Sequence, residues 1–321
     1  MSRICIRIAC LLALVAVAAP LYAQGVTLRY RWNKGETLAY RMQILTTSQV
    51  SGMPGRGEAT LQQTMTQTLK ILVDDVAADG TATLKQTFDA VRMEMDGPMG
   101  KFVYDTASPS STSTNPMAQS MGKVLAAMVG ETITVVQAPD GTVRRVEGAT
   151  RIMDKIVKSL PADPSATAIA QALKTSLSDD ALKATLEQSF TRMPDAPVKP
   201  GDTWKGAMNM GNDMIGKITG SVDFALKALD GAGDAATARI AIAMTMKQES
   251  APPSGPGGMV VKLQDAHGEG EMLFDVGKGR IRKSTMKSTM PSTITGQSPD
   301  GSPMSVQNNT TTSMTFELIG R

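Results

Sequence analysis

Apolar and polar residues alternate with a period of two over most of the chain outside its middle part. In an early stretch the even positions from Leu38 to Ile44 are apolar, whereas Thr37, Arg41 and Gln43 are polar. Successive side chains of a β-strand point to opposite faces, so this alternation is typical of a strand with one buried face. The pattern therefore predicts long strands, each buried on one side.

A long β-hairpin is predicted early in the chain. Alternation runs over residues 61–73, Asp79-Gly80 supplies a turn, and alternation resumes over residues 82–95. The apolar phase shifts after Phe88, which predicts a β-bulge near Asp89 because one extra residue moves the following side chains to the other face.

The middle of the chain has helical periodicity instead. Over residues 149–160 the apolar positions recur every three or four residues, with charged positions between them. Capping residues predict further helices that open at Asn115, at Asp163-Pro164 and at Ser178. A short hairpin around Pro139-Asp140-Gly141 is expected between the first two helices. The middle segment is therefore predicted to be mainly helical.

The first 23 residues are predicted to be a signal peptide. Arg3 and Arg7 precede the apolar run 9–19, and Ala23 is a small residue at a cleavage position. The run is shorter than the ~20 apolar residues that a membrane-spanning helix needs. We therefore expect a protein exported to the periplasm or secreted, with no transmembrane span in the mature chain.

Removal of this signal peptide changes the chemistry that remains. Both cysteines, Cys5 and Cys10, leave with it, and the loss of Arg3 and Arg7 from 33 basic residues leaves 31 against 30 acidic ones. A nearly neutral chain does not favour nucleic acid as a partner. A single histidine, His267, excludes a multi-histidine zinc site. We expect no metal site and no cofactor.

No group of residues has the spacing of a catalytic site. His267 lies in a polar stretch near a turn and is expected to be on the surface. The neighbouring carboxylates of Asp74-Asp75 and Asp179-Asp180 lack the convergent arrangement of an acid–base pair. Five basic residues between Lys278 and Lys287 are expected to form a solvated strand face. We expect no catalytic residues and a protein that is not an enzyme.

A short motif occurs in both flanks of the chain. Gly35-Glu36-Thr37-Leu38 recurs as Gly201-Asp202-Thr203-Trp204, and long strands follow each copy. We interpret the two copies as a duplication. Chance is the alternative, because Gly130-Glu131-Thr132-Ile133 repeats the motif without the strands that follow it.

The predicted fold is α+β and mainly antiparallel, with two duplicated curved β-meanders and a helical middle segment. Its parts are a signal peptide at 1–23, a first β-meander at 24–106, a linker and helical segment with a short hairpin at 107–198, and a second β-meander at 199–321.

Three segments resemble a family of uncharacterised exported bacterial proteins. They are the early strand Arg29-Tyr30-Arg31-Trp32 with Gly35-Glu36-Thr37, the segment Lys199-Pro200-Gly201-Asp202-Thr203-Trp204, and Phe274-Asp275 with Gly279-Arg280-Ile281. The resemblance covers most of the mature chain and implies location and fold, with no activity attached. The last segment is also similar to a hairpin of periplasmic lipoprotein carriers, whose curved sheet holds an acyl chain; the helices in the middle of this chain depart from that pattern.

Methionine is unusually frequent, with 23 residues against six phenylalanines, four tyrosines and two tryptophans. The pairs Met93/Met95, Met208/Met210 and Met244/Met246 are spaced so that each shares one strand face. Methionine fills irregular apolar interiors and adaptable binding surfaces. Thioethers also bind Cu(I).

These observations predict an exported, non-enzymatic protein that binds or carries an apolar, lipid-like molecule such as an envelope lipid. The candidate lining residues are Tyr40, Met42, Trp204, Met208, Met210 and Phe224. Two alternatives stay open: a structural or interaction protein of the cell envelope with no small ligand, and a methionine-based Cu(I)-binding protein.

Overall fold

A computed structural model describes residues 25–52, 57–98, 100–108, 116–159, 178–189, 192–212, 216–250, 260–297 and 302–320. In this described part, thirteen strands form one antiparallel sheet. The strands are β1 (Thr37–Ser51), β2 (Ala59–Val76), β3 (Ala82–Gly97), β4 (Gly100–Asp105), β5 (Thr132–Gln137), β6 (Val143–Glu147), β7 (Thr203–Asn212), β8 (Gly216–Asp230), β9 (Thr237–Ser250), β10 (Val260–Leu263), β11 (Ala266–Asp275), β12 (Arg280–Gln297) and β13 (Pro303–Gly320). The helices are α1 (Pro116–Met128), α2 (Ala149–Ser159) and α4 (Asp179–Ser189), with a 3-10 turn at Gly233–Ala235.

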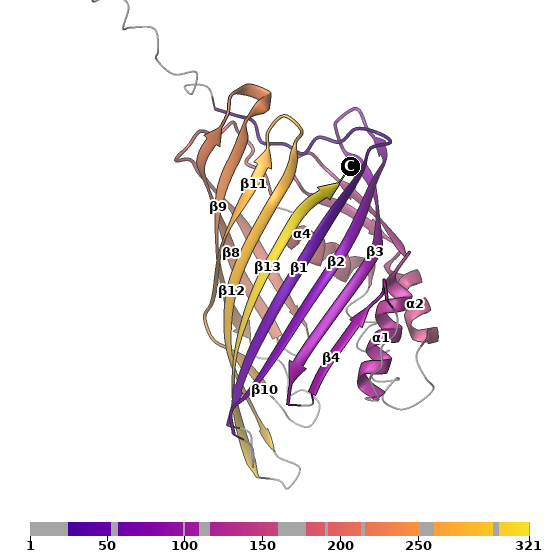
Figure 1. Cartoon of the computed structure of the whole chain (residues 1–321). Coiled ribbons are helices and arrows are strands. Elements are labelled where there is room, and N and C mark those ends of the chain that lie inside the picture. The colour runs from indigo at the N-terminus through magenta and orange to yellow at the C-terminus, as the bar shows by residue number, and fades with distance from the viewer. Residues whose placement is uncertain are drawn as a thin grey trace, which may run out of the picture.

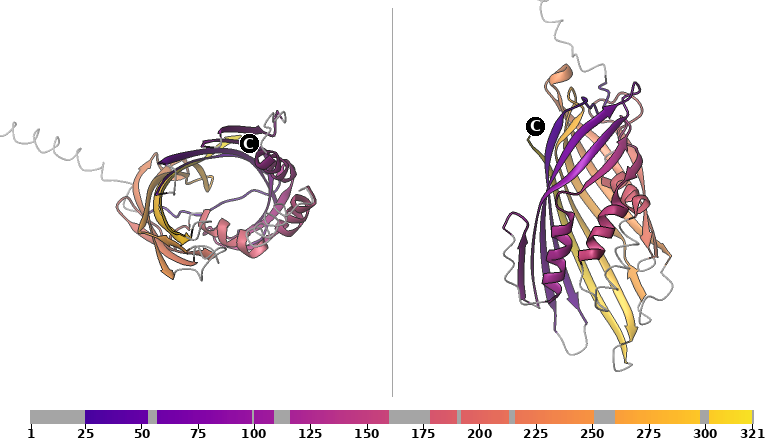
Figure 2. Two further views of the ribbon diagram at one scale, coloured as in Figure 1. Left: turned by 90° about the horizontal axis from the view of Figure 1, so that it is seen from below. Right: turned by 90° about the vertical axis from the view of Figure 1, so that its right-hand side faces the viewer.

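The sheet joins the two flanks of the chain into one surface. Its strand order is β6-β5-β3-β2-β1-β13-β12-β11-β9-β8-β7, with β4 beside β3 and β10 beside β12. The contact of β1 with β13 brings Tyr40 opposite Leu318 and Val50 opposite Asn308. Seen along its length, the sheet curls round an interior, with the helices on the side where the ring of strands is open (Figures 1 and 2). The mainly antiparallel α+β prediction is confirmed, and the duplication stays a prediction.

The predicted hairpin and bulge are both present. Strands β2 and β3 pair over almost their full length. Thr68 is opposite Ala90 and Leu69 is opposite Phe88, so Asp89 is the additional residue of a bulge. The phase shift in the apolar pattern therefore located the irregularity correctly.

Glycines allow neighbouring strands to come close where the sheet curves. A Cβ atom on Gly220 would lie 2.2 Å from the backbone oxygen of Thr245, and one on Gly270 would lie 2.1 Å from that of Thr285. Real side chains cannot approach a backbone atom so closely. Glycine inside a strand is typical of such close approaches and bends.

The predicted helices agree with the structure where it describes them. Helix α4 begins after Ser178, whose Oγ accepts a hydrogen bond from the N–H of Ala181 at 3.1 Å, as expected for an N-cap. Ile152 and Ile156 of α2 are buried in the core. The predicted helix at Asp163-Pro164 lies outside the described residues. Within the described residues, no helix has the length and apolar character needed to cross a membrane.

The strand predicted at Arg29-Tyr30-Arg31-Trp32 is wrong. Residues 27–33 are extended but belong to no sheet. Their backbone bonds to separate turns instead: Tyr30 N–H donates to Pro139 O at 2.8 Å, and Arg31 N–H donates to Gly279 O at 3.0 Å. The alternation was real, but it reflects which side chains enter the core.

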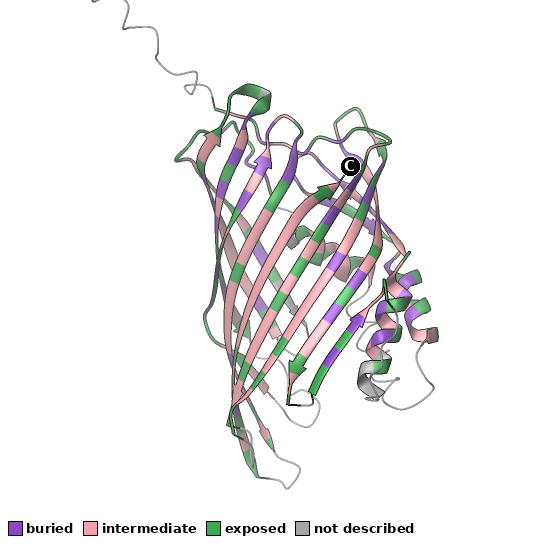
Figure 3. Ribbon diagram, in the orientation of Figure 1, coloured by how far each residue is buried: buried purple, intermediate pink, exposed green. Residues whose placement is uncertain are grey.

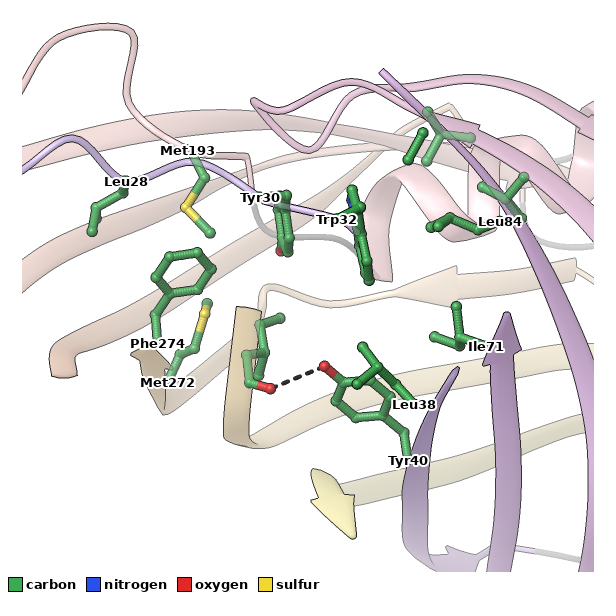
Figure 4. Close-up of a cluster of buried hydrophobic side chains, with 14 of the residues drawn as sticks. Leu28, Tyr30, Trp32, Leu38, Tyr40, Ile71, Leu84, Met193, Met272 and Phe274 are labelled. Carbon is green, nitrogen blue, oxygen red and sulfur yellow. Dashed lines mark hydrogen bonds between the residues drawn. The ribbon is translucent and has the colours of Figure 1, made fainter. Parts of the chain in front are cut away.

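This N-terminal segment fills one end of the curved sheet. Leu28, Tyr30 and Trp32 are all buried in the main core (Figure 4). The rings of Tyr30 and Trp32 stack with their centroids 6.2 Å apart, and Tyr30 meets Phe274 edge-on at 5.7 Å. The aromatic contact with Phe274 holds the segment against β11. The interior is therefore packed at the end where β1 begins.

A buried ion pair joins two turns beside this core. The guanidinium of Arg280 is bidentate to Glu36, with N–O distances of 2.7 and 3.0 Å. Arg280 is only 2% exposed. The expectation that the basic residues near it form a solvated face is therefore wrong for Arg280, because it is enclosed by Glu36 and the turn at Lys278, whose carbonyl oxygen it also contacts.

Candidate functional site: the inner face of the sheet

The side of the sheet that carries the core residues Leu38 and Phe274 is called the inner face below. Away from the packed end, its residues are not fully buried. Met42 and Ile44 of β1 and Met314 of β13 belong to the inner face and remain partly exposed. Figure 3 shows the same intermediate burial along most of β1, β12 and β13. Side chains that point into a fully packed interior would be buried, so the inner face is accessible here.

One line of apolar residues crosses the inner face from β4 to β7. We call this line the apolar row; each member is directly opposite the next in the strand register. Its members are Tyr104, Met93, Met65, Ile44, Met314, Met286, Gly270, Ile242, Phe224 and Trp204. The four central members, from Met65 to Met286, are half-buried. Three of these four are methionines, which adapt their shape to a partner.

A line of hydroxyl groups follows on the same face. Thr46 of β1 is opposite Thr312 of β13, which is opposite Ser288 of β12. We call these three residues the hydroxyl row. Each is two positions along its strand from a member of the apolar row, a separation of about 7 Å. The inner face thus changes from apolar to polar along the strands, away from the packed end.

Charged side chains are excluded from this part of the inner face. Every described inner-face position of β1, β2, β12 and β13 carries an uncharged residue. Apart from the buried Arg280 at the start of β12, the charged residues of these strands occupy outer positions in the same register, as Arg41, Lys287 and Glu317 do. An uncharged, partly apolar surface is suited to a neutral ligand, because nothing on it would balance a buried charge.

Two of the predicted lining residues lie on β1. Tyr40 is 3% exposed, and its ring stacks on Phe316 with centroids 4.5 Å apart. Its hydroxyl donates to the backbone oxygen of Ile281 at 3.1 Å (Figure 4). Met42, opposite Phe316, is half-buried on the accessible part of the inner face. The structure thus packs Tyr40 into the core and places Met42 beside the apolar row.

The other predicted lining residues lie on β7 and β8. The rings of Trp204 and Phe224 stack at 5.5 Å, and both belong to the apolar row. The Trp204 indole N–H donates to the backbone oxygen of Arg192 at 2.9 Å. Met208 is buried in a separate apolar cluster. The side chain of Met210 lies outside the described part of the structure.

Burial raises the pKa of the Tyr40 hydroxyl above its usual value. The folded protein therefore keeps the proton while the unfolded chain loses it above about pH 10, so stability falls as the pH rises through that value. We expect Tyr40→Phe to cost about 1 kcal/mol at pH 7, through loss of the bond to Ile281. At pH 11 this deficit should shrink or reverse. Urea unfolding at both pH values measures it; an equal deficit at both would contradict the assignment.

A cleft borders the inner face at the edge strand β7. Its volume is about 630 Å³. Trp204 forms part of its wall together with the charged residues Arg192, Asp195, Asp202 and Lys205. This mixture of charges distinguishes the cleft from the uncharged inner face.

Methionines near the C-terminal end of β9 belong to a separate cluster. Met208 and Met246 are buried, and Met244 and Met290 are packed against them together with aliphatic residues. The methyl carbon of Met244 lies 3.0 Å from the place that a Cβ on Gly268 would occupy, so the glycine makes room for it. The apolar surroundings fit the role of methionine as a filler of irregular space. Binding of Cu(I) by these thioethers stays a prediction.

The acidic residues and the histidine form no metal centre in the described chain. No group of three or more His, Cys, Asp or Glu residues is close enough to hold a metal ion within the described ranges. His267 is exposed at an outer position of β11, so the prediction of a surface histidine is confirmed. Asp74 and Asp75 form separate exposed ion pairs with Lys85 and Lys34.

The central residues of both rows could not be identified from the sequence. Met65, Ile44, Met314 and Met286 are far apart in the chain and meet only through the pairing of β1 with β13 and of its neighbours. Alternation correctly indicated that each faces one side of its strand. The strand order and register bring the members of the rows together. Neither can be predicted from the residues that surround each member in the sequence.

Structural comparisons find proteins that are similar over most of this chain. Lipovitellin, in a study of its lipid–protein interactions, is similar at 9% identity and a TM-score of 0.46; the match covers 90% of this chain and 26% of that one. This chain thus spans about a quarter of that protein.

Two further structures match with lower scores. DynF from the dynemicin biosynthesis pathway of Micromonospora chersina has a TM-score of 0.20 and 11% identity, covering 93% of this chain and 89% of its own. A protein of Bacteroides fragilis described as exported, with a YmcC-like fold, has a TM-score of 0.19 and 8% identity, covering 88% and 97%. TM-scores this low do not establish a common fold.

Sequence comparison identifies the family. No curated protein matches the chain. A family model matches residues 79–281, which include strands from both flanks and the helical middle. The resemblance to an uncharacterised family is thereby confirmed: the chain belongs to DUF6263, a family of unknown function.

Proposed function

We propose that this protein is an exported, non-enzymatic protein that binds an apolar, lipid-like molecule on the inner face of its sheet. The observation that carries the proposal is the half-buried centre of the apolar row, Met65, Ile44, Met314 and Met286. Apolar side chains exposed inside a curved sheet leave surface that a ligand can remove from water, at about 25 cal/mol per Å². Pockets for small apolar molecules have this mixture of adaptable apolar lining and few polar groups.

Two features of the described chain support this function. The interior is packed around Tyr30 and Trp32 at one end but remains accessible farther along β1. Apart from Arg280, which is paired with Glu36, the charged residues of the central strands occupy outer positions, so the accessible part of the inner face is uncharged. The basic and apolar pattern of residues 1–23 supports export.

The test measures binding of N-phenyl-1-naphthylamine, a neutral dye whose fluorescence rises in apolar surroundings. The wild-type protein is expected to bind the dye. Met314→Glu places a charge in the centre of the apolar row and removes apolar contact, so we expect about tenfold or greater loss of affinity. Mass spectrometry of organic extracts from protein purified from its own envelope should identify the natural ligand.

Thr315→Glu is the matched control, because Thr315 is the next residue of β13 and lies on the outer face. It should bind the dye as the wild type does. Both variants must unfold at a temperature close to that of the wild type. Absence of dye binding to the wild type, or an equal loss in both variants, would contradict the proposal, and an empty organic extract would favour an envelope protein without a small ligand.

A further inference from the structure

We infer that the inner face selects an uncharged amphiphile with a hydroxyl-bearing head, whose apolar part lies on the apolar row and whose head lies on the hydroxyl row. This inference rests on the proposed function and names the class of ligand. It follows from three observations: the order of side chains along three neighbouring strands, the hydrogen bonding of their hydroxyl groups, and the positions of the charged residues on the outer face.

The two rows are adjacent on the same strands. On β1, Ile44 precedes Thr46; on β13, Met314 is two positions from Thr312. On β12, Met286 is likewise two positions from Ser288. A molecule that lies along the strands would therefore contact both rows at once. Because the apolar row is nearer the packed end, the apolar part of the ligand would point toward that end.

The hydroxyl row is available for hydrogen bonding. Among the described residues, Thr46, Thr312 and Ser288 make no side-chain hydrogen bond, and all three are half-buried. The next hydroxyls along the strands differ, because Ser48 and Thr310 bond to each other at 3.1 Å. Each hydroxyl of the row has one donor and free acceptor positions. Three such groups side by side are suited to a head that both donates and accepts.

The head must also be uncharged. A carboxylate or phosphate on the hydroxyl row would need a positive partner, and removal of an unpaired charge from water is costly. Lys287 and Arg41 are close in sequence to the two rows but occupy outer positions. The sheet lies between these cations and the ligand. A glycerol or sugar head fits the row, whereas a fatty-acid carboxylate does not.

The chain offers a matched control for the hydroxyl row. Thr47, Thr311 and Thr289 are the immediate sequence neighbours of the three members and form a corresponding row on the outer face. The two rows differ in residue type at one place only, where the outer row has Thr289 and the inner row has Ser288, and they lie at nearly the same depth of the sheet. Only the inner substitution should affect a ligand held inside.

The experiment compares two probes with the same oleoyl chain, 1-monooleoylglycerol and oleate, as competitors of N-phenyl-1-naphthylamine. For the wild type we expect monooleoylglycerol to bind about tenfold more tightly than oleate. In the triple variant Thr46→Val, Thr312→Val, Ser288→Ala, the affinity for monooleoylglycerol should fall about tenfold or more, as expected for the loss of two or three hydrogen bonds. The affinity for the dye, which has no hydroxyl group, should stay within about twofold.

The outer variant Thr47→Val, Thr311→Val, Thr289→Ala should bind all three compounds as the wild type does. If the dye binds but oleate competes as well as monooleoylglycerol, or if the inner variant keeps its affinity for monooleoylglycerol, the inference is overturned and the proposed function stands. If the inner variant loses dye and monooleoylglycerol equally, the row has a general structural role and the inference is again overturned. If the wild type does not bind the dye, both fail.

Discussion

Gly279→Ala is expected to destabilise the protein by about 3 kcal/mol or more. Gly279 has a φ of +58°, a conformation that costs alanine about 1 kcal/mol. The added Cβ would also lie 2.5 Å from the backbone nitrogen of Arg31 and 2.6 Å from the backbone oxygen of Arg29. The N-terminal segment would have to move, and Tyr30 and Trp32 would leave the core with it. Urea unfolding, followed by tryptophan fluorescence, measures this loss.

Gly35→Ala separates the two causes. Gly35 also has a positive φ, +81°, but a Cβ there would meet no atom within 4 Å. We expect this control to lose only about 1 kcal/mol, the conformational cost alone. Equal losses at Gly35 and Gly279 would show that the close contact with the N-terminal segment is unimportant.

Glu36→Gln is expected to cost about 3 kcal/mol. It removes the charge that balances the guanidinium of Arg280, which is 2% exposed. A buried charge whose partner is lost is strongly destabilising. Adding Arg280→Met to Glu36→Gln should recover part of the loss, since the unpaired charge is then removed. Urea unfolding of the single and double variants measures both effects.

An exposed ion pair nearby is the control. Lys34 and Asp75 are 2.9 Å apart, and their side chains are 69% and 61% exposed. Asp75→Asn should change stability far less than Glu36→Gln, because solvent screens an exposed pair. Equal losses of stability in Asp75→Asn and Glu36→Gln would show that burial of Arg280 has no special role. So would a double variant that loses as much stability as Glu36→Gln and Arg280→Met lose separately when their losses are added.

The strands and helices could be predicted from the sequence because their signals are local. Alternation located β2 and β3 and placed the bulge at Asp89. Ser178 marked the start of α4. Each of these features depends on residues that are neighbours in the chain, where side-chain direction follows from the backbone period.

The N-terminal segment could not be predicted in the same way. Its alternation of Tyr30 and Trp32 with arginines matches that of a strand, but the partners of its backbone are the turns at Pro139 and Gly279. A β-strand requires a neighbouring strand with which its backbone can form a ladder of hydrogen bonds. This segment crosses the end of the curved sheet, where its backbone bonds to turns instead. The alternation of buried and exposed residues alone does not distinguish a strand of a sheet from an extended segment outside it.

The candidate site depends on contacts between distant parts of the chain. The motif around Glu36 and the segment around Arg280 meet in one ion pair across 244 residues. The apolar row likewise depends on the pairing of Ile44 with Met314. Its methionine content was visible in the sequence, and this supported the expectation of an adaptable apolar surface. Which methionines share that surface followed only from the register.

The accessibility of the inner face and its binding of a ligand are tested most directly by the reactivity of a cysteine at position 314, in a protein whose Cys5 and Cys10 are replaced by serine. We expect Met314→Cys to react with an uncharged maleimide in the folded protein, and N-phenyl-1-naphthylamine to slow this reaction. Thr315→Cys, on the outer face, should react at the same rate with and without the dye. A cysteine at 314 that does not react, or that reacts equally fast in the presence of the dye, would contradict an accessible, ligand-binding inner face.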